Sequence, residues 1–343
     1  MIVNKNLSFR NVLSFTWFHI VWIICWVTFA SFLFQTLNWK FLSMPWLPIS
    51  IIGTAVSFYV GFKNNQSYDR LWEARKIWGG IINSSRKFGA MVKSYVSDLN
   101  VEATEGELYA IKKRLIYRHI AWNYVLRKQL LVPTPWEHLS QGKTMNMMIK
   151  KRMKDYGIGL VDNNEIDEIL SQFLDTLEKD KLLTYKNVAT QLIDLQAQDL
   201  LQLRKAGLID DFRHMELQKI LNDFYDYQGK CERIKKFPLP RQYGGMSGVF
   251  VGIFIFLLPF GMIPEFEKFG HIGGWLAIPA TSLIAWVFLM MELVGDYSEN
   301  PFEGLGNDIP MMSLCRVIEI DLRDMLDEKD LPEPIKAKKG ILM

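Results

Sequence analysis

Residues 54–80 read TAVSFYVGFKNNQSYDRLWEARKIWGG, and this stretch decides the fold. It passes, without a proline, from an uncharged segment of membrane-spanning composition into a charged segment rich in tryptophan. The pattern predicts one helix that leaves the lipid and continues into water. Thr54, Phe58 and Phe62 recur every four residues, which places them on one helix face over about 12 Å of rise. Such a face lines a pore if several copies surround one axis, or packs against neighbouring helices; periodicity alone leaves both open.

Hydrophobic and charged residues are segregated along the chain. Of 343 residues, 49% are hydrophobic and 22% are charged, yet four windows contain no Asp, Glu, Lys or Arg: 11–39, 41–62, 242–264 and 269–291. Each window exceeds the roughly 17–20 residues that a helix needs to cross a bilayer core. We therefore expect an integral membrane protein with four spans, at about 12–37, 46–62, 243–263 and 271–292.

Basic residues near the span ends predict the orientation and the domains. Lys40 and Lys268 lie in the two short loops, whereas the opposite span ends are flanked by clusters of Lys and Arg. The positive-inside rule then places the N-terminus, the middle region and the C-terminus in the cytoplasm. The expected domains are a first transmembrane hairpin (1–62), a cytosolic helical domain that continues the second span (63–241), a second transmembrane pair (242–294) and an acidic cytosolic C-terminal segment (295–343).

The two predicted cytosolic parts carry opposite charge. Residues 63–241 hold 30 Lys and Arg against 23 Asp and Glu, a net +7, and residues 292–334 hold 3 against 12, a net −9, so we expect them to dock. Helical periodicity over 105–131, 165–176, 185–205 and 211–234 predicts a mostly helical middle region. Thr134 and Pro135 have the residue types of an N-cap and first helical turn.

Motifs for enzyme chemistry are absent from the sequence. The five histidines and three cysteines show no metal-ligand or catalytic spacing, and there is no GxSxG, Walker lysine or GxGxxG pattern after a strand. We expect no enzyme activity, no cofactor, no bound metal and no nucleic-acid partner. Ion-coupled transporters usually carry an ionisable group near the bilayer midplane, which the four windows lack. A passive pore needs only a ring of apolar side chains that resists wetting.

Polar and aromatic residues follow the stripe and form a predicted collar below the bilayer. The collar residues are Asn64, Asn65, Tyr68, Arg70, Trp72, Glu73, Arg75 and Trp78. Such residues serve as an interfacial anchor, as helix–helix hydrogen-bonding partners or in a specific function, and the pattern alone does not separate these roles.

The run GFKNNQSYDRLWEARKIWG at 61–79 resembles the bestrophin family. It is most similar to the bacterial and plant-organelle branch, whose second helix carries the pattern G-F-R-N-N-x-x-Y-x-R-W-W-E-A-R-x-x-W-G. Further agreement comes from RHIAW at 118–122, CERIK at 231–235 with PLP at 238–240, NPF at 300–302 and DIP at 308–310. The resemblance covers roughly the whole chain.

The resemblance implies an all-α, homopentameric ion channel in the bacterial inner (plasma) membrane. Each protomer would give four transmembrane helices and a large helical cytosolic domain, with one pore on the five-fold axis. The narrow neck maps onto Thr54, Phe58 and Phe62. The outermost position is commonly aliphatic in the family and is polar here, so the hydrophobic gate would rest mainly on the two phenylalanines. A second, cytosolic constriction maps to the region of Ile209 and Phe212.

The first functional hypothesis is a passive channel for small monovalent inorganic ions, with anions such as chloride favoured slightly by the net charge of +7. Bacterial members of the family include cation conductors, so a sodium channel of the same architecture stays open. A membrane-tethered interaction module without conductance is the alternative from another class.

Animal relatives bind calcium through a dense acidic run after Asn-Pro-Phe. Here Glu303 and Asp308 are separated by glycines, which predicts no strong calcium clasp.

Overall fold

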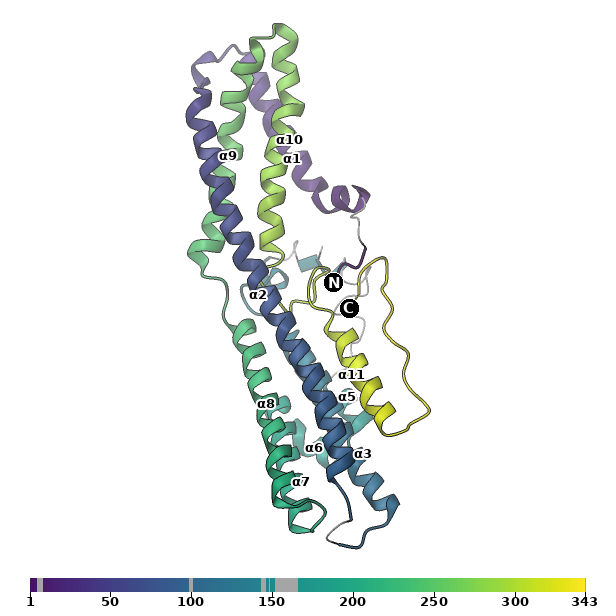
Figure 1. Ribbon diagram of the computed structural model, residues 1–343. Helices are drawn as coiled ribbons and strands as arrows, with labels where there is room; N and C mark the ends of the chain where they lie inside the picture. The colour runs from purple at the N-terminus through teal and green to yellow at the C-terminus, as the bar shows by residue number, and fades with distance from the viewer. Residues whose placement is uncertain (5–8, 99–100, 143–145, 148, 152–165, 343) are drawn as a thin grey trace. The chain divides into compact units, whose positions relative to one another are not determined.

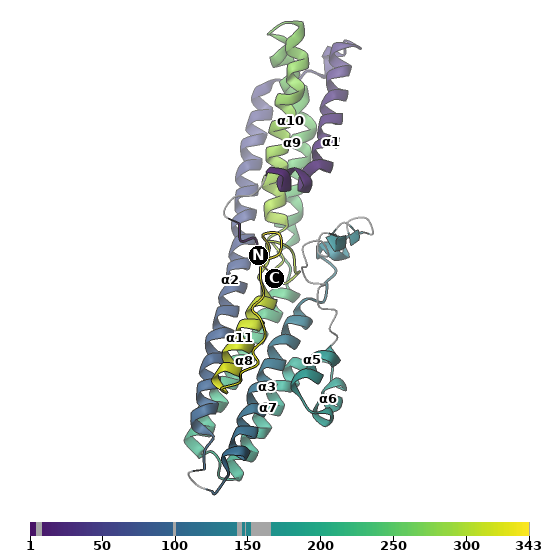
Figure 2. The same cartoon turned by 90° about the vertical axis from the view of Figure 1, so that its right-hand side faces the viewer.

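The computed structural model describes residues 1–4, 9–98, 101–142, 146–147, 149–151 and 166–342, and helices dominate them (Figures 1 and 2). The helices are α1 (Phe9–Gln35), α2 (Trp46–Tyr95), α3 (Glu105–Leu130), α5 (Ile166–Phe173), α6 (Thr176–Leu183), α7 (Val188–Lys205), α8 (Asp211–Lys236), α9 (Arg241–Glu267), α10 (His271–Asp296) and α11 (Met311–Met325), with 3-10 turns at Lys40–Leu42 and His138–Ser140. Within the described ranges, β pairing is limited to isolated bridges that involve Ile341. The mostly helical fold is confirmed.

Helix α2 is the continuous element that the sequence predicts. It runs for 50 residues, from the apolar segment through the collar and beyond it. Pro48 lies in its first turn, where the missing N–H has no intrahelical partner to lose. Together with α1, α9 and α10, it supplies the four stretches that are long and apolar enough to cross a membrane. The four predicted spans therefore coincide with helices of sufficient length.

The chain packs into two compact units. Unit 1 consists of Met1–Val3, Leu71–Phe237 and Pro301–Met343, and unit 2 consists of Asn4–Arg70 and Pro238–Asn300. Unit 2 contains α1, α9, α10 and the part of α2 up to Arg70. The predicted domain boundaries after 62, 241 and 294 separate membrane segments from cytosolic segments, whereas the two units are defined by packing. The predicted boundaries remain predictions.

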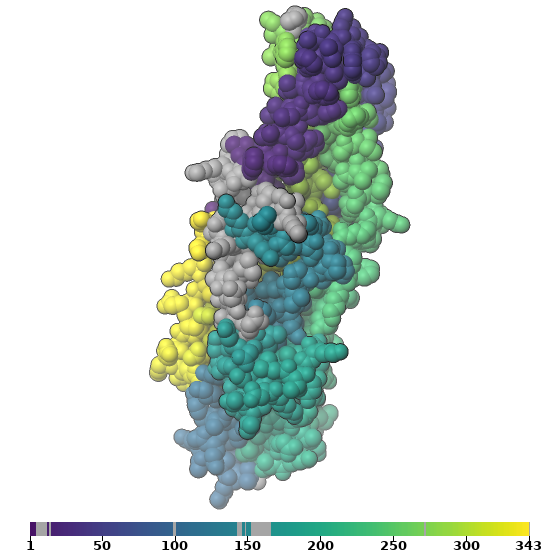
Figure 3. Space-filling model, turned by 180° about the vertical axis from the view of Figure 1, so that it is seen from behind, coloured from purple at the N-terminus to yellow at the C-terminus, as the bar shows by residue number. Residues whose placement is uncertain are grey.

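Unit 2 is a bundle of α1, the first part of α2, α9 and α10. Figure 3 shows the atoms of α1 lying against those of α9 and α10. The main buried apolar residues are Ile23, Val27, Ile49, Val56, Val60, Val251, Phe254, Ile255, Leu258 and Met262. The ring of Phe254 approaches the backbone of α2 at Gly53. A Cβ added at Gly53 would lie only 2.8 Å from that ring. Close packing of this kind holds helices together where lipid supplies no hydrophobic driving force.

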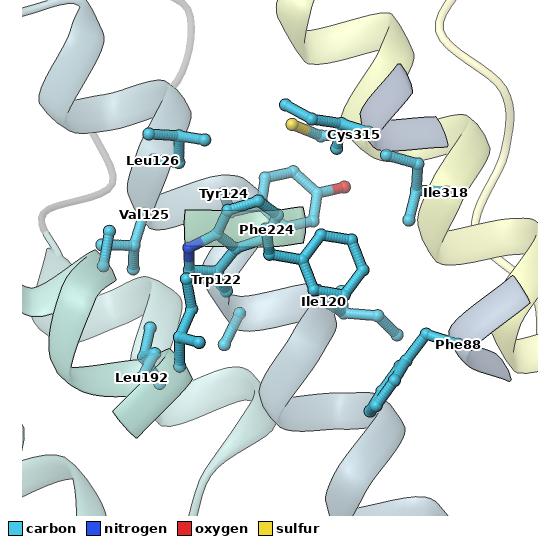
Figure 4. Packing of buried hydrophobic residues seen from close by; sticks show 14 of the residues in the cluster. Phe88, Ile120, Trp122, Tyr124, Val125, Leu126, Leu192, Phe224, Cys315 and Ile318 are labelled. Atoms are coloured by element: carbon cyan, nitrogen blue, oxygen red, sulfur yellow. The ribbon is translucent and has the colours of Figure 1, made fainter. Parts of the chain in front are cut away.

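Unit 1 has a separate core in which α3 meets α7, α8 and α11. Trp122 and Phe224 lie at its centre (Figure 4), and the Trp122 indole N–H donates a hydrogen bond to Gln228 Oε1 at 3.2 Å. Helix α11 adds Cys315 and Ile318 to the same core. The predicted docking of the acidic C-terminal segment on the basic middle region is therefore confirmed within this unit. Apolar burial contributes more to it than charge, because exposed pairs are worth only about 0–1 kcal/mol.

One predicted helix start is wrong. No helix begins at Thr134 and Pro135; a 3-10 turn begins at His138 instead. The side chain of Glu137 accepts a hydrogen bond from the Thr134 amide at 3.1 Å, and the Glu137 amide donates to the Thr134 carbonyl at 3.2 Å. These two bonds close a turn around Pro135, which replaces the first turn of a longer helix.

Two phenylalanines on α8 provide a matched test of the unit 1 core. Phe224 is fully buried, and Phe212 is 83% exposed. We expect Phe224→Ala to lower the stability of the detergent-solubilised protein by about 3–5 kcal/mol, because it leaves a cavity. Phe212→Ala should change it by less than about 0.5 kcal/mol. Thermal unfolding followed by tryptophan fluorescence measures both, and equal melting temperatures would contradict this description of the core.

His119 predicts how the core responds to acid. Its Nε2 lies 2.8 Å from Ser85 Oγ, its ring lies 4.3 Å from that of Phe224, and burial lowers its pKa from 6.5 to about 3. The unfolded chain therefore takes up this proton first as the pH falls, so stability is lost between about pH 6.5 and 3, by at most about 1.4 kcal/mol per pH unit. Melting temperatures between pH 7.5 and 4.5 should fall more steeply for the wild type than for His119→Gln. Parallel slopes would show that His119 does not titrate in this way.

Candidate functional site: the outward face of α2

The three predicted neck residues lie on a face of α2 that the other helices of unit 2 leave uncovered. Thr54 is exposed, and the side chains of Phe58 and Phe62 are 68% and 70% exposed in the protomer. Val56 and Val60, on the opposite side of the helix, are buried in the unit 2 core. The stripe is therefore not used for packing within its own protomer. It is available to another copy, to lipid or to a pore.

A buried ion pair fixes the rotation of α2 directly after Phe62. The ammonium of Lys63 bonds Oε1 of Glu292 on α10, and the hydroxyl of Ser247 on α9 donates to Oε2 of the same carboxylate. The side chains of Lys63 and Glu292 are only 2% and 10% exposed. Each carboxylate oxygen thus has its own donor, and the group of three side chains is neutral overall.

The pairing of Lys63 with Glu292 cannot be read from the sequence alone. The windows without charged residues end at 62 and 291, so Lys63 and Glu292 lie one residue beyond them. Taken separately, the windows give no sign that these two ends meet. The pair points into the helix bundle and satisfies itself, which is the arrangement expected of a structural pair in a membrane protein.

Two collar residues fasten α2 to the end of α10. The Asn64 amide donates to the Met291 carbonyl at 3.0 Å, and a Cβ added at Gly295 would lie only 2.1 Å from Asn64 Oδ1. Further along α2, Arg70 Nε donates to the Glu299 carbonyl at 2.8 Å. Asn65 and Tyr68 point outward and are exposed. Part of the predicted collar is thus a set of helix–helix hydrogen bonds.

The other collar residues belong to unit 1 and have different environments. Trp78 is fully buried in the core, so it is a packing residue. Glu73 forms an ion pair with Arg233 on α8 at 2.6 Å. Arg75 is half-buried, and Trp72 is exposed. The eight residues that the sequence groups together therefore divide into exposed, bonded and core positions.

The two residues of the predicted cytosolic constriction also have different environments. Ile209 is buried in the unit 1 core, whereas Phe212, at the start of α8, is 83% exposed. Of the two, only Phe212 presents its side chain at the protomer surface. Its place in a constriction remains a proposal.

The acidic residues after Asn300 are used internally. Asp308 is buried, and its two oxygens accept hydrogen bonds from the amides of Phe302, Gly304 and Ile309. Burial raises its pKa, and these amides oppose the shift. Glu303 bonds His138 Nδ1 at 2.9 Å. In the part of the chain that the structure describes, no group of three or more His, Cys, Asp and Glu side chains is placed to hold a metal ion.

The ion pair gives a direct test of what holds α2 in place. Lys63→Met leaves the Glu292 carboxylate buried without a cation, and we expect it to lower the stability of the detergent-solubilised protein by about 3–5 kcal/mol. The double variant with Glu292→Gln should recover most of that loss, because no charge is then stranded. Melting temperatures measure the difference.

The exposed pair Lys268–Glu265, at 2.6 Å, is the control. Lys268→Met should cost less than about 1 kcal/mol, since exposed pairs contribute little. If Lys63→Met costs no more than Lys268→Met, the buried pair does not position α2.

Comparisons with known proteins agree with this architecture. The sequence matches the family model described as "Bacterial/Fungal Bestrophin protein" over residues 9–324. It is 26% identical over 288 residues to "Voltage-dependent anion channel-forming protein YneE" of Escherichia coli K12, covering 84% of this chain and 79% of the relative. It is 27% identical over 292 residues to "Voltage-dependent anion channel-forming protein mll4386" of Mesorhizobium japonicum, covering 85% and 78%.

A solved structure shares the fold. The crystal structure of a bacterial bestrophin homolog from Klebsiella pneumoniae superposes with a TM-score of 0.73, over 91% of this chain and 99% of that chain, at 20% sequence identity. Such a low identity shows a common fold and carries no information on individual site residues.

Proposed function

Because the chain belongs to the bacterial/fungal bestrophin family, whose model spans residues 9–324, we propose that it forms a passive homo-oligomeric channel for small monovalent ions, chiefly anions such as chloride. The relatives described as voltage-dependent anion channel-forming proteins support this choice of ion. The net charge of +7 on residues 63–241 is a weaker argument for it. The protein is then a conductor rather than an enzyme.

The observation that carries the proposal is the outward position of the stripe on α2. Phe58 and Phe62 are about two-thirds exposed, although the helix they lie on is otherwise packed through Val56, Val60 and Lys63. In a closed ring of copies, each protomer would contribute the same stripe to a central axis. Two successive rings of benzyl side chains would then form a hydrophobic gate, with Thr54 at its outer, more polar end.

The proposed assembly is a homopentamer in the bacterial inner (plasma) membrane. Residues 1–62 and 242–294 would cross the bilayer, and residues 63–241 and 295–343 would lie in the cytoplasm with both termini. Phe212 is the candidate for a second constriction in the cytosolic part. The other two hypotheses are a sodium channel of the same architecture and a membrane-tethered module without conductance.

Replacing the gate rings tests the neck assignment. We expect Phe58→Ala and Phe62→Ala each to raise ion flux through purified protein in liposomes, because a wider and less apolar constriction wets more readily. Phe32→Ala is the matched control, since Phe32 is an exposed phenylalanine on α1; its flux should equal that of the wild type. Flux that is unchanged in all three variants would remove Phe58 and Phe62 from the pathway.

Reversal potentials in asymmetric NaCl separate the two ion types. A potential near the chloride equilibrium value supports the anion channel, and one near the sodium value supports the cation channel of the same architecture. A wild-type protein that carries no current or flux under any condition would instead favour the tethered module.

A further inference from the structure

We propose that Asp69 is a specificity-determining residue of this channel, placed at the mouth of the neck, where its carboxylate weakens the preference for anions. The inference rests on the proposed channel function. It adds a residue that neither the neck stripe nor the collar includes.

Asp69 continues the stripe of Thr54, Phe58 and Phe62 along α2. It follows Phe62 by seven residues, which in an α-helix is a rotation of about 20° and a rise of about 10 Å. Its side chain is exposed, as are those of Asn65 and Gln66 between them. The uncovered face of α2 thus changes from apolar to polar directly after Phe62 and then reaches a carboxylate.

That change of character marks where this face of α2 leaves an apolar environment and enters water. A phenylalanine side chain is tolerated against lipid, but a carboxylate facing hydrocarbon costs several kcal/mol. Asp69 therefore needs water, and a position at the cytoplasmic mouth of the proposed pore is consistent with that need. The same face would carry both the gate and the charge.

Asp69 is also the first charge on this face that has no partner. In the parts of the chain that the structure describes, it forms no hydrogen bond or ion pair. Neighbouring charges on α2 are engaged: Lys63 with Glu292, Arg70 with the Glu299 carbonyl and Glu73 with Arg233. Asp69 is therefore the exposed charge on this face, whereas the guanidinium of Arg70 is half-buried against the Glu299 carbonyl.

A symmetric assembly turns one carboxylate into a ring of them. Such a ring concentrates cations and repels anions at the pore mouth, and it acts without direct contact with the ion. Its reach is about one Debye length, which is about 10 Å in 0.1 M salt and about 3 Å in 1 M salt. An effect of Asp69 must therefore fade at high salt, which a change in channel shape would not do.

The test measures reversal potentials in asymmetric NaCl near 0.1 M for the wild type, Asp69→Asn, Asp69→Glu and Asp98→Asn. Asp98 is an exposed carboxylate beyond the end of α2 and serves as the control. We expect Asp69→Asn to raise the chloride-to-sodium permeability ratio about three-fold or more, as for a change in potential of order kT. Asp69→Glu and Asp98→Asn should match the wild type, and the effect of Asp69→Asn should shrink near 1 M salt.

A cysteine variant tests whether Asp69 faces the ion pathway. Asp69→Cys is made together with Cys25→Ser, because Cys25 is exposed while Cys231 and Cys315 are buried. A methanethiosulfonate reagent forms a disulfide with the introduced thiolate and releases methanesulfinate, so it adds a chosen charge at one site. A sulfonate reagent should restore the wild-type permeability ratio, and a trimethylammonium reagent should raise the preference for chloride further.

The possible outcomes distinguish a failure of the proposed role of Asp69 from a failure of the proposed channel function. If the wild type conducts and Phe58→Ala and Phe62→Ala raise the flux, but Asp69→Asn and both reagents leave the reversal potential unchanged, Asp69 does not face the pathway and only this inference falls. An effect of Asp69→Asn that persists at 1 M salt would also overturn it, since it would point to altered packing. If the wild type carries no current, both the channel function and the role of Asp69 fall together.

Discussion

A buried ammonium is tolerated in a helix bundle only if a carboxylate meets it, and in unit 2 that requirement fixes α2 against α9 and α10. Lys63 bonds one oxygen of Glu292, and Ser247 bonds the other. Because both carboxylate oxygens are occupied, α2 cannot rotate about its axis without stranding a charge. The residues adjacent to Lys63 are therefore held in one orientation. That orientation is what leaves Phe58 and Phe62 on the outside.

The same pair reconciles buried charge with passive conduction. An ionisable group inside a membrane protein commonly marks a coupling site, because it must change partner or protonation during transport. Here the charges lie between helices of one protomer and are matched to each other. They stabilise the frame of the proposed pore, while the proposed gate would be built from apolar rings. The buried ion pair and the face proposed to line the pore thus lie on different sides of α2.

Helix α2 contributes buried side chains to two separate cores. Its first part contributes Val56 and Val60 to the core of unit 2, and its last part contributes Trp78 and Phe88 to the core of unit 1. The unit 1 core also takes in α11, so the acidic C-terminal segment is held by apolar burial rather than by its charge alone. The run at 61–79 that resembles the family pattern therefore contains both buried residues, such as Trp78, and exposed residues, such as Trp72.

The sequence by itself determined the four apolar helices, the unbroken α2 and the four-residue stripe, because these follow from local composition and helical periodicity. It did not pair Lys63 with Glu292, which lie 229 residues apart and meet only when α2 and α10 pack. Nor did it separate the buried Trp78 and Ile209 from the exposed Trp72 and Phe212. Burial depends on which helix lies opposite each side chain. Helical periodicity shows which side chains share one face of a helix, but it does not show which helix packs against that face. Burial is therefore decided by tertiary packing.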